Sequence, residues 1–195
     1  MRIGDLGKSV TKLWMAVLLT FIAALTTMAC AADGAAPKPK YVFLMIGDGM
    51  GVPQRMSADL YKNIEAGGQP GEAAGVLLMN RFPVKGLTTT HPIGAPITDS
   101  AAAATALACG EKTKNGRLSI DANGQTKFKS IAYTAKEAGM KVGIVSSVPI
   151  DHATPAAFYA CENSRGNYYE IAAQAASSGF NYFAGQYFLG GKPDK

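Results

Sequence analysis

The sequence predicts an α/β fold: a three-layer sandwich in which helices cover both faces of a mostly parallel sheet. Hydrophobic types make up 48% of the 195 residues and charged types 17%, which is enough apolar surface to exclude a disordered polyelectrolyte. Short apolar segments alternate with helical segments of about ten residues, as in the βαβ units of an open sheet. Ligands of such sheets bind at the carboxyl ends of the strands, and three polar segments follow predicted strand ends here.

Residues 1–31 have the three-part layout of a secretory signal peptide. Three basic residues precede an uncharged apolar run over 13–25, and Ala29-Cys30-Ala31 fits a cleavage site. The run is shorter than the roughly 20 residues that span a membrane, so we expect cleavage after Ala31. Cleavage before Cys30 with a lipid on its sulfur, and a buried N-terminal helix, stay open as alternatives. The prediction is a protein exported across the inner membrane, periplasmic or lipid-anchored at the cell envelope.

The folded part is predicted to span 41–195, after a Pro/Ala/Lys linker over 32–40. The apolar run 41–48 is closed by Gly-Asp-Gly and is typical of a buried strand that ends at Asp48. A helix is expected over 51–65.

The middle of the chain carries strong turn signals. A loop is expected over 67–75 and a second strand over 84–91. Residues 99–110 predict a helix that stops at Gly110, since glycine tolerates the left-handed conformation that ends helices. Two Asn-Gly pairs within 114–126 indicate hairpin-like turns.

The last third repeats the alternation of helix and strand. We expect an amphipathic helix over 130–139, a buried strand over 141–147, helices over 154–164 and 168–178, and a short strand over 181–185.

Asp48-Gly49-Met50-Gly51 follows the first predicted strand. A carboxylate at a strand end suits a metal, because Zn²⁺ and Mg²⁺ both accept carboxylate oxygen. The glycines let backbone approach such a site closely. The same four residues also fit a plain turn.

Ser100 is expected at the N-terminus of the helix 99–110, where unpaired N–H groups and the helix dipole favour an alkoxide and then a bound phosphate. The alternative is that Asp99 or Ser100 only caps the helix. No G-x-S-x-G elbow surrounds Ser100, and nothing indicates a Ser/His/Asp triad with His91 or His152. A serine without a dedicated base needs another way to lose its proton, and metal coordination is one.

The segment 151–155 (DHATP) offers oxygen and imidazole ligands beyond the strand 141–147. Arg165 follows eleven residues after Thr154, and its planar fork binds phosphate oxygens in pairs. Taken alone, Arg165 also fits a surface charge and His152 a structural histidine.

Three stretches together carry a family resemblance: YVFLMIGDGMG (41–51), GLTTTHPIGAPITDSAAAATALACGEKTKNGRLSID (86–121) and HATPAAFYACENSR (152–165). Their order and spacing resemble the N-terminal part of an alkaline phosphatase. The resemblance implies that family's fold and a metal-dependent hydrolysis of phosphate monoesters at two Zn²⁺ ions and one Mg²⁺ ion.

The resemblance also implies roles for single residues. Ser100 matches the zinc-activated nucleophile that forms a phosphoserine, and Asp48 matches the carboxylate that bridges this zinc and the magnesium. Thr154 matches a magnesium ligand, and Arg165 matches the guanidinium that holds the phosphoryl oxygens.

His152 falls at a position that is Asp in some members of the family and His in others. Imidazole is a poorer magnesium ligand than carboxylate, so His152 is expected as a metal-site residue that binds directly, acts from the outer shell or favours another metal. Asp99 is expected to orient Arg165 through a salt bridge.

The chain is expected to hold an incomplete site. Catalytic domains of the family are usually more than twice this length, and after Arg165 the sequence has no histidine and one aspartate, Asp194. The alternative to a phosphomonoesterase is therefore a catalytically inert truncated fragment, or a phosphate- or metal-binding module. Another phospho- or sulfo-transfer enzyme of the same architecture is a third possibility.

The expected partners are small phosphate monoesters. The net charge of +5 includes no Lys/Arg cluster interleaved with aromatic residues, so a nucleic acid is not expected. The resemblance implies a homodimer. After signal cleavage Cys109 and Cys161 remain; their pairing is left open, and Cys109 is expected as a small buried hydrophobe.

Overall fold

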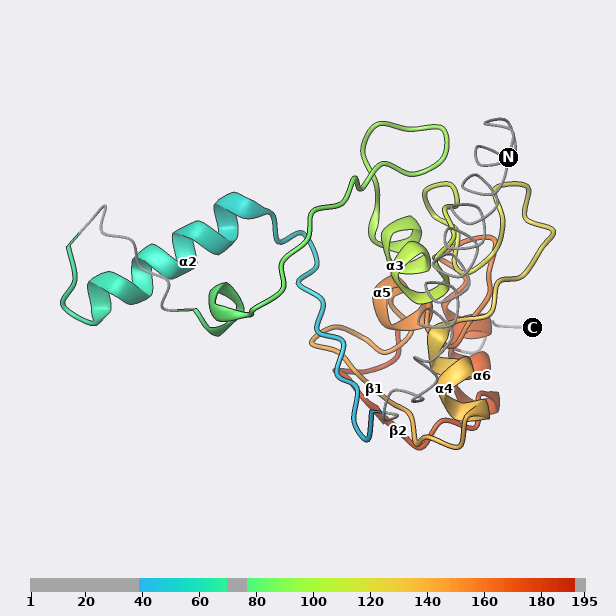
Figure 1. Cartoon of the computed structure of the whole chain (residues 1–195). Helices are drawn as coiled ribbons and strands as arrows, with labels where there is room; N and C mark the ends of the chain where they lie inside the picture. The colour runs from blue at the N-terminus through green and yellow to red at the C-terminus, as the bar shows by residue number, and fades with distance from the viewer. Residues whose placement is uncertain (1–38, 70–76, 192–195) are drawn as a thin grey trace, which may run out of the picture. The chain divides into compact units, whose positions relative to one another are not determined.

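The computed structural model describes residues 39–69 and 77–191 (Figure 1). The chain divides into two compact units, Met1–Ile46 and Gly47–Lys195. The second unit contains all the helices and strands described below.

Some predictions lie outside the described residues. They are the signal peptide over 1–31, the linker over 32–38 and the part of the predicted loop over 70–75.

After the first two helices, the described elements run as two helices and one strand, twice over (Figure 1). In chain order they are α2 (Val52–Glu65), the 3₁₀ helix η1 (Leu78–Arg81), α3 (Ser100–Cys109), α4 (Ile131–Glu137), β1 (Gly143–Val145), α5 (Ala153–Ala156), α6 (Tyr168–Ser177) and β2 (Tyr182–Ala184). Strands β1 and β2 pair in parallel, with Ile144 opposite Phe183. The segment β1–α5–α6–β2 is thus the predicted βαβ unit, and it makes the fold an incomplete α/β type.

Two predicted strands are absent from the described residues. The predictions over 41–48 and 84–91 are wrong, since neither segment is in a sheet there. Phe43 is 81% exposed and Leu87 fully so. Apolar composition supplies strand propensity, but a strand also needs a hydrogen-bonding neighbour.

Strand β1 forms within the predicted range 141–147, but it is not buried. Val145 is 72% exposed, because a two-stranded sheet has no further strand or helix to cover that face in the described chain.

Helix α3 forms as predicted because both of its end signals act locally. Asp99 precedes it and accepts a hydrogen bond from the Ala102 N–H at 2.9 Å. Gly110 ends it at φ 73°, the left-handed conformation that glycine adopts without strain. Helices α2, α4 and α6 also lie inside or close to their predicted ranges.

Helix α5 is one turn long, so the predicted helix over 154–164 is mostly wrong. Tertiary hydrogen bonds replace the helical ones: the carbonyls of Ala157, Phe158 and Tyr159 accept from the side chains of Ser119, Ser130 and Tyr133, respectively. The donating hydroxyl groups belong to neighbouring segments, and the chain leaves the helix so that its carbonyls reach them.

The hairpin-like turns over 114–126 are confirmed. Gly116 and Gly124 have φ of 82° and 75°, and an antiparallel bridge between Ile120 and Lys127 closes the second turn. Only glycine and a few polar residues adopt this conformation readily.

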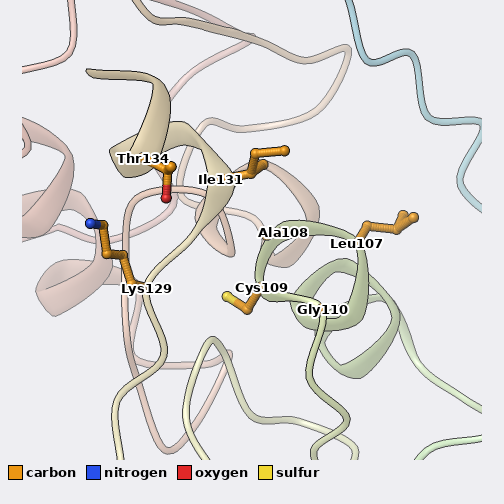
Figure 2. A pocket seen from close by; sticks show the side chains of 7 residues that line it. All are labelled: Leu107, Ala108, Cys109, Gly110, Lys129, Ile131 and Thr134. Carbon is orange, nitrogen blue, oxygen red and sulfur yellow. The ribbon is translucent and has the colours of Figure 1, made fainter. Parts of the chain in front are cut away.

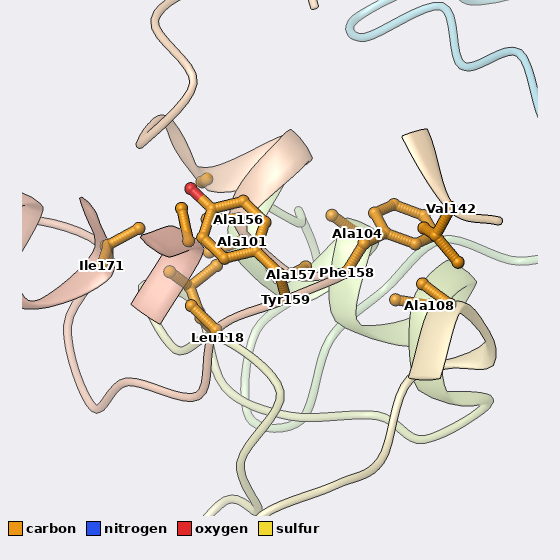
Figure 3. Close-up of a cluster of buried hydrophobic side chains, with 14 residues drawn as sticks. Ala101, Ala104, Ala108, Leu118, Val142, Ala156, Ala157, Phe158, Tyr159 and Ile171 are labelled. Carbon is orange, nitrogen blue, oxygen red and sulfur yellow. The ribbon is translucent and has the colours of Figure 1, made fainter. Parts of the chain in front are cut away.

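Small side chains form the contact that positions the site. Ala101, Ala104 and Ala108 of α3 are buried in one cluster with Ala156 and Ala157 at the end of α5 (Figure 3). Alanine adds little bulk, so the two helix backbones approach closely. Their first turns, which carry Ser100 and Thr154, are thereby brought together.

Candidate active site

Asp48 accepts hydrogen bonds from two hydroxyl groups far away in the sequence. Its Oδ1 lies 3.2 Å from Ser100 Oγ and its Oδ2 lies 2.7 Å from Thr154 Oγ1. The carboxylate stands on a tight turn in which Gly49 has φ of 67°. The turn interpretation of Asp48 is confirmed, and the turn presents the carboxylate to the two hydroxyl groups.

Ser100 is the first residue of α3, and it does not cap the helix. Asp99 takes the capping role, which leaves the Ser100 hydroxyl to face Asp48. The free N–H groups of the first turn and the positive end of the helix dipole lie beside this hydroxyl. This local environment favours a negative charge on Ser100 Oγ.

Asp99 holds three parts of the chain with one carboxylate. Oδ1 accepts from the Ala102 N–H, and Oδ2 accepts from the Gly116 N–H at 2.9 Å and from Arg165 Nη1 at 3.2 Å. The predicted salt bridge between Asp99 and Arg165 is therefore present.

Arg165 is fixed at its backbone as well as at its guanidinium. Its N–H donates to the Gly116 carbonyl at 2.7 Å. Its Nη2 lies 3.5 Å from His152 Nε2. The cation therefore lies between the carboxylate of Asp99 and the imidazole of His152.

Residues 115–116 were missed as site residues, although their Asn-Gly turn was predicted. Asn115 Oδ1 accepts from the Asp99 N–H at 2.9 Å, and Gly116 binds both Asp99 and Arg165. The Asn-Gly pair indicated a turn, but nothing in its sequence indicated which residues the turn would contact.

The predicted ligand segment 151–155 is divided between two environments. Asp151 is fully buried, and its Oδ2 accepts from the N–H groups of Leu189 and Gly190 at 2.7 and 2.9 Å. It anchors the chain just before His152. His152 and Thr154 instead lie in the network with Arg165 and Asp48.

The five predicted site residues thus form two linked groups at one end of α3. Asp48, Ser100 and Thr154 share one set of hydroxyl–carboxylate bonds, and Arg165 and His152 are in contact through the guanidinium. Asp99 joins the groups, because it precedes Ser100 and binds Arg165. His91 takes no part; its ring contacts Lys112.

The donor set favours a hard cation. Four oxygen atoms converge, two from Asp48 and one each from Ser100 and Thr154, and oxygen ligands are those that Mg²⁺ prefers. Among residues 39–69 and 77–191, no three His, Cys, Asp or Glu side chains gather as a metal cluster. The described residues therefore fit part of an oxygen-ligated site and do not assemble a zinc site of nitrogen and carboxylate ligands.

The sequence model of the alkaline phosphatase family matches residues 39–190. The chain belongs to the alkaline phosphatase family. An alkaline phosphatase of Gadus morhua is 37% identical over 77% of this chain, and alkaline phosphatase 4 of Bacillus subtilis is 41% identical over 67% of it. These matches cover 34% and 28% of those two relatives, so the chain spans about a third of the length of the alkaline phosphatases it matches.

Solved alkaline phosphatases share the fold. The cold-active enzyme of a psychrophilic Shewanella species superimposes with a TM-score of 0.61 and 38% identity, over 75% of this chain and 35% of that one. The Thermus thermophilus alkaline phosphatase gives a TM-score of 0.60 and 34% identity, over 69% and 28%. The predicted α/β class is confirmed by these neighbours. Within the described part of the chain, no helix has both the length and the apolar character to cross a membrane.

Proposed function

We propose that this chain supplies the nucleophile and the phosphate-binding arginine of a metal-dependent phosphomonoesterase. The observation that carries the proposal is the hydrogen bond of Ser100 Oγ to Asp48 Oδ1 at the first residue of α3. Family membership supports it. The substrates proposed are small phosphate monoesters.

The first half of the reaction uses the end of α3. Asp48 Oδ1 accepts the hydrogen bond of the Ser100 hydroxyl and so directs its oxygen. Ser100 Oγ attacks phosphorus in line with the ester oxygen: the Oγ–P bond forms and the ester P–O bond breaks. The departing oxygen gains a proton in exchange for the one that Ser100 releases, and it leaves as the alcohol. The free N–H groups of the first turn and the Arg165 guanidinium stabilise the charge on the phosphoryl oxygens.

The second half hydrolyses the phosphoserine. Water attacks phosphorus from the side the alcohol left, the P–Oγ bond breaks, and Ser100 recovers its proton. Asp99 keeps Arg165 in place through both halves, because it is hydrogen-bonded to the Gly116 N–H as well as to the guanidinium.

Asp48, Ser100 and Thr154 would hold a hard cation of the Mg²⁺ type by their oxygen atoms. Bound there, a cation would lower the pKa of the Ser100 hydroxyl and stabilise charge on oxygen. His152 contacts Arg165 at 3.5 Å, which supports a role outside the direct ligands.

A comparison of two serine variants tests the proposal. Hydrolysis of a chromogenic phosphomonoester by the purified chain is measured at alkaline pH with added Zn²⁺ and Mg²⁺. Turnover by the parent chain is expected to be abolished by Ser100→Ala and unchanged by Ser177→Ala, a change at an exposed serine at the end of α6. Measurable turnover at the same rate in Ser100→Ala and in the parent chain would refute the role of Ser100.

No turnover by a folded parent chain would instead favour the alternative, an inert fragment. Calorimetric titration of the parent chain and of an Arg165→Ala variant with inorganic phosphate then tests the binding half of the proposal by itself.

A further inference from the structure

Two thiols lie against the same hairpin, residues 118–128. Cys109 ends α3, and its Sγ donates to Ser119 Oγ at 3.4 Å. Cys161 Sγ contacts the Phe128 carbonyl at 3.5 Å. Ser119 and Phe128 are neighbours across this hairpin, since the Phe128 N–H donates to the Ser119 carbonyl at 2.8 Å. The two sulfur atoms therefore contact adjacent points.

An isolated antiparallel bridge holds the segment of Cys161 beside the segment of Ser119, which Cys109 contacts. Leu118 and Glu162 exchange both N–H···O bonds at 2.9 Å as an antiparallel bridge. Ser119 follows Leu118 and Cys161 precedes Glu162, so the two residues leave this isolated bridge on the same side, and Ser119 turns away from extended backbone at φ 48°. The segment of Cys161 therefore lies beside the segment whose Ser119 hydroxyl contacts Cys109.

Cys109 is open to small reagents. It lines a surface hollow of about 370 Å³ with Lys129, Ile131 and Thr134. Figure 2 shows its side chain directed toward the segment of Lys129, which follows the Phe128 that Cys161 contacts. Both thiols are free and half-buried.

The thiols also influence each other electrostatically. Burial raises the pKa of both, and the charge of Cys109 raises the pKa of Cys161 further. Both groups are therefore protonated at neutral pH, and their exchange reactions quicken as the pH rises.

We propose that Cys109 and Cys161 form a reversible intrachain disulfide when the chain meets a small disulfide oxidant such as oxidised glutathione. The Cys109 thiolate attacks one sulfur of the oxidant and releases one thiol; the Cys161 thiolate then attacks Cys109 Sγ in the mixed disulfide and releases the second. The two protein thiols lose two electrons and two protons, and the oxidant is reduced to two thiols.

The bond would connect two parts of the candidate site. Ser100 begins the helix that Cys109 ends, and Arg165 follows Cys161 by four residues. The disulfide would therefore tie the helix of the nucleophile to the segment of the arginine. The proposal does not depend on catalytic activity.

Peptide mapping of the oxidised chain tests the proposal. The full chain carries Cys30→Ser, so that only the two thiols remain, and is equilibrated with oxidised glutathione at mildly alkaline pH, quenched in acid and digested. We expect a linked peptide pair containing Cys109 and Cys161, with both thiols lost together and recovered by dithiothreitol. We also expect a higher Tm in the oxidised chain, since the link closes a long loop.

Single variants provide the controls. In Cys109→Ser and in Cys161→Ser, the remaining thiol is expected to carry glutathione as a stable mixed disulfide. The same mapping in urea reports whether the fold brings the thiols together, and there the linked pair is expected to decline. Independent glutathione adducts at both cysteines of the folded chain would overturn the proposal, as would a linked pair that forms equally well in urea.

Discussion

Asp99 Oδ2 lies 3.2 Å from Arg165 Nη1, and the other oxygen of the same carboxylate caps α3. The residue that begins the helix of Ser100 therefore also holds the arginine. A shift of the helix and a shift of the guanidinium are coupled through one side chain.

Asp99→Asn is expected to separate these two roles. The amide oxygen keeps one acceptor for the backbone N–H groups, whereas the charge that faces Arg165 is lost. We expect phosphate affinity to fall several-fold, with stability changed by less than about 1 kcal/mol because both partners are about a quarter exposed. Asp99→Ala, which also removes the cap, is expected to lose about 1 kcal/mol more. Phosphate titration and thermal unfolding measure the two effects; equal loss of stability in both variants would contradict the separation.

Gly116→Ala is expected to destabilise the fold and weaken phosphate binding. Its φ of 82° costs a residue with a Cβ about 1–2 kcal/mol, and its backbone binds both Asp99 and Arg165. The matched control is Gly86→Ala, a glycine in open space without a positive φ. Urea unfolding of both variants measures the difference. The same urea midpoint for Gly116→Ala and Gly86→Ala would show that the turn at Gly116 tolerates a side chain.

Thr105→Val is expected to lower the free energy of unfolding by about 1–3 kcal/mol, since it leaves a buried N–H without a partner. Thr105 is fully buried; its hydroxyl donates to the Ala101 carbonyl at 2.8 Å and accepts from the Ser119 N–H at 2.9 Å. Thr88→Val, at an exposed threonine, is the control. Denaturant unfolding measures both variants, and a neutral Thr105→Val would mean that the Ser119 N–H finds another acceptor.

Stability is expected to fall at alkaline pH. Burial raises the pKa values of Cys109 and Tyr159 above their ordinary 9.0 and 10.0, and the charge of Asp151 adds to the shift of Tyr159. The folded state therefore keeps protons that the unfolded chain releases. The stabilisation is complete below about pH 9 and is lost as the pH rises toward the raised values.

Thermal unfolding between about pH 7 and pH 11 measures this decline. Tyr159→Phe is the informative variant: it lacks the hydrogen bond to the Ile150 carbonyl at 2.6 Å and should be less stable at neutral pH. Its Tm should then decline less steeply with pH than that of the parent chain. If Tm declined equally with pH in the variant and in the parent chain, Tyr159 would not account for the loss of stability.

The N-terminal prediction is tested by sequencing the mature protein from a bacterial host. Cleavage of the signal peptide predicts a chain that begins at Ala32, whereas the lipoprotein alternative predicts a lipidated Cys30 at the N-terminus. An uncleaved Met1 would contradict both.

Local signals predicted the helices well. Asp99 and Gly110 bound α3 because a cap and a left-handed glycine act within a few residues. The strands over 41–48 and 84–91 were not predicted correctly, since pairing depends on a partner that composition does not reveal. Helix α5 is shorter than predicted because its next carbonyls bind side chains from other segments.

Prediction of the candidate site was limited in the same way, because its contacts join distant segments. From the residues alone, Asp48 fitted a turn as well as a metal ligand, and Ser100 fitted a helix cap as well as a nucleophile. The family resemblance favoured the second interpretation of each, and the structure brings the two residues within hydrogen-bond distance. The contacts of Asn115 and Gly116 with Asp99 were not predicted. They join residues many positions apart, and periodicity carries no information on such pairs.

The alanine contact between α3 and α5 has a consequence for how the site is assembled (Figure 3). Alanine has no side-chain rotamers, so packing these helices freezes no side-chain freedom. It also offers no alternative arrangement into which the interface can relax. The contact works as a spacer of fixed thickness, and a single added methylene at Ala104 or Ala156 would widen the spacing between Ser100 and Thr154 rather than be absorbed by repacking.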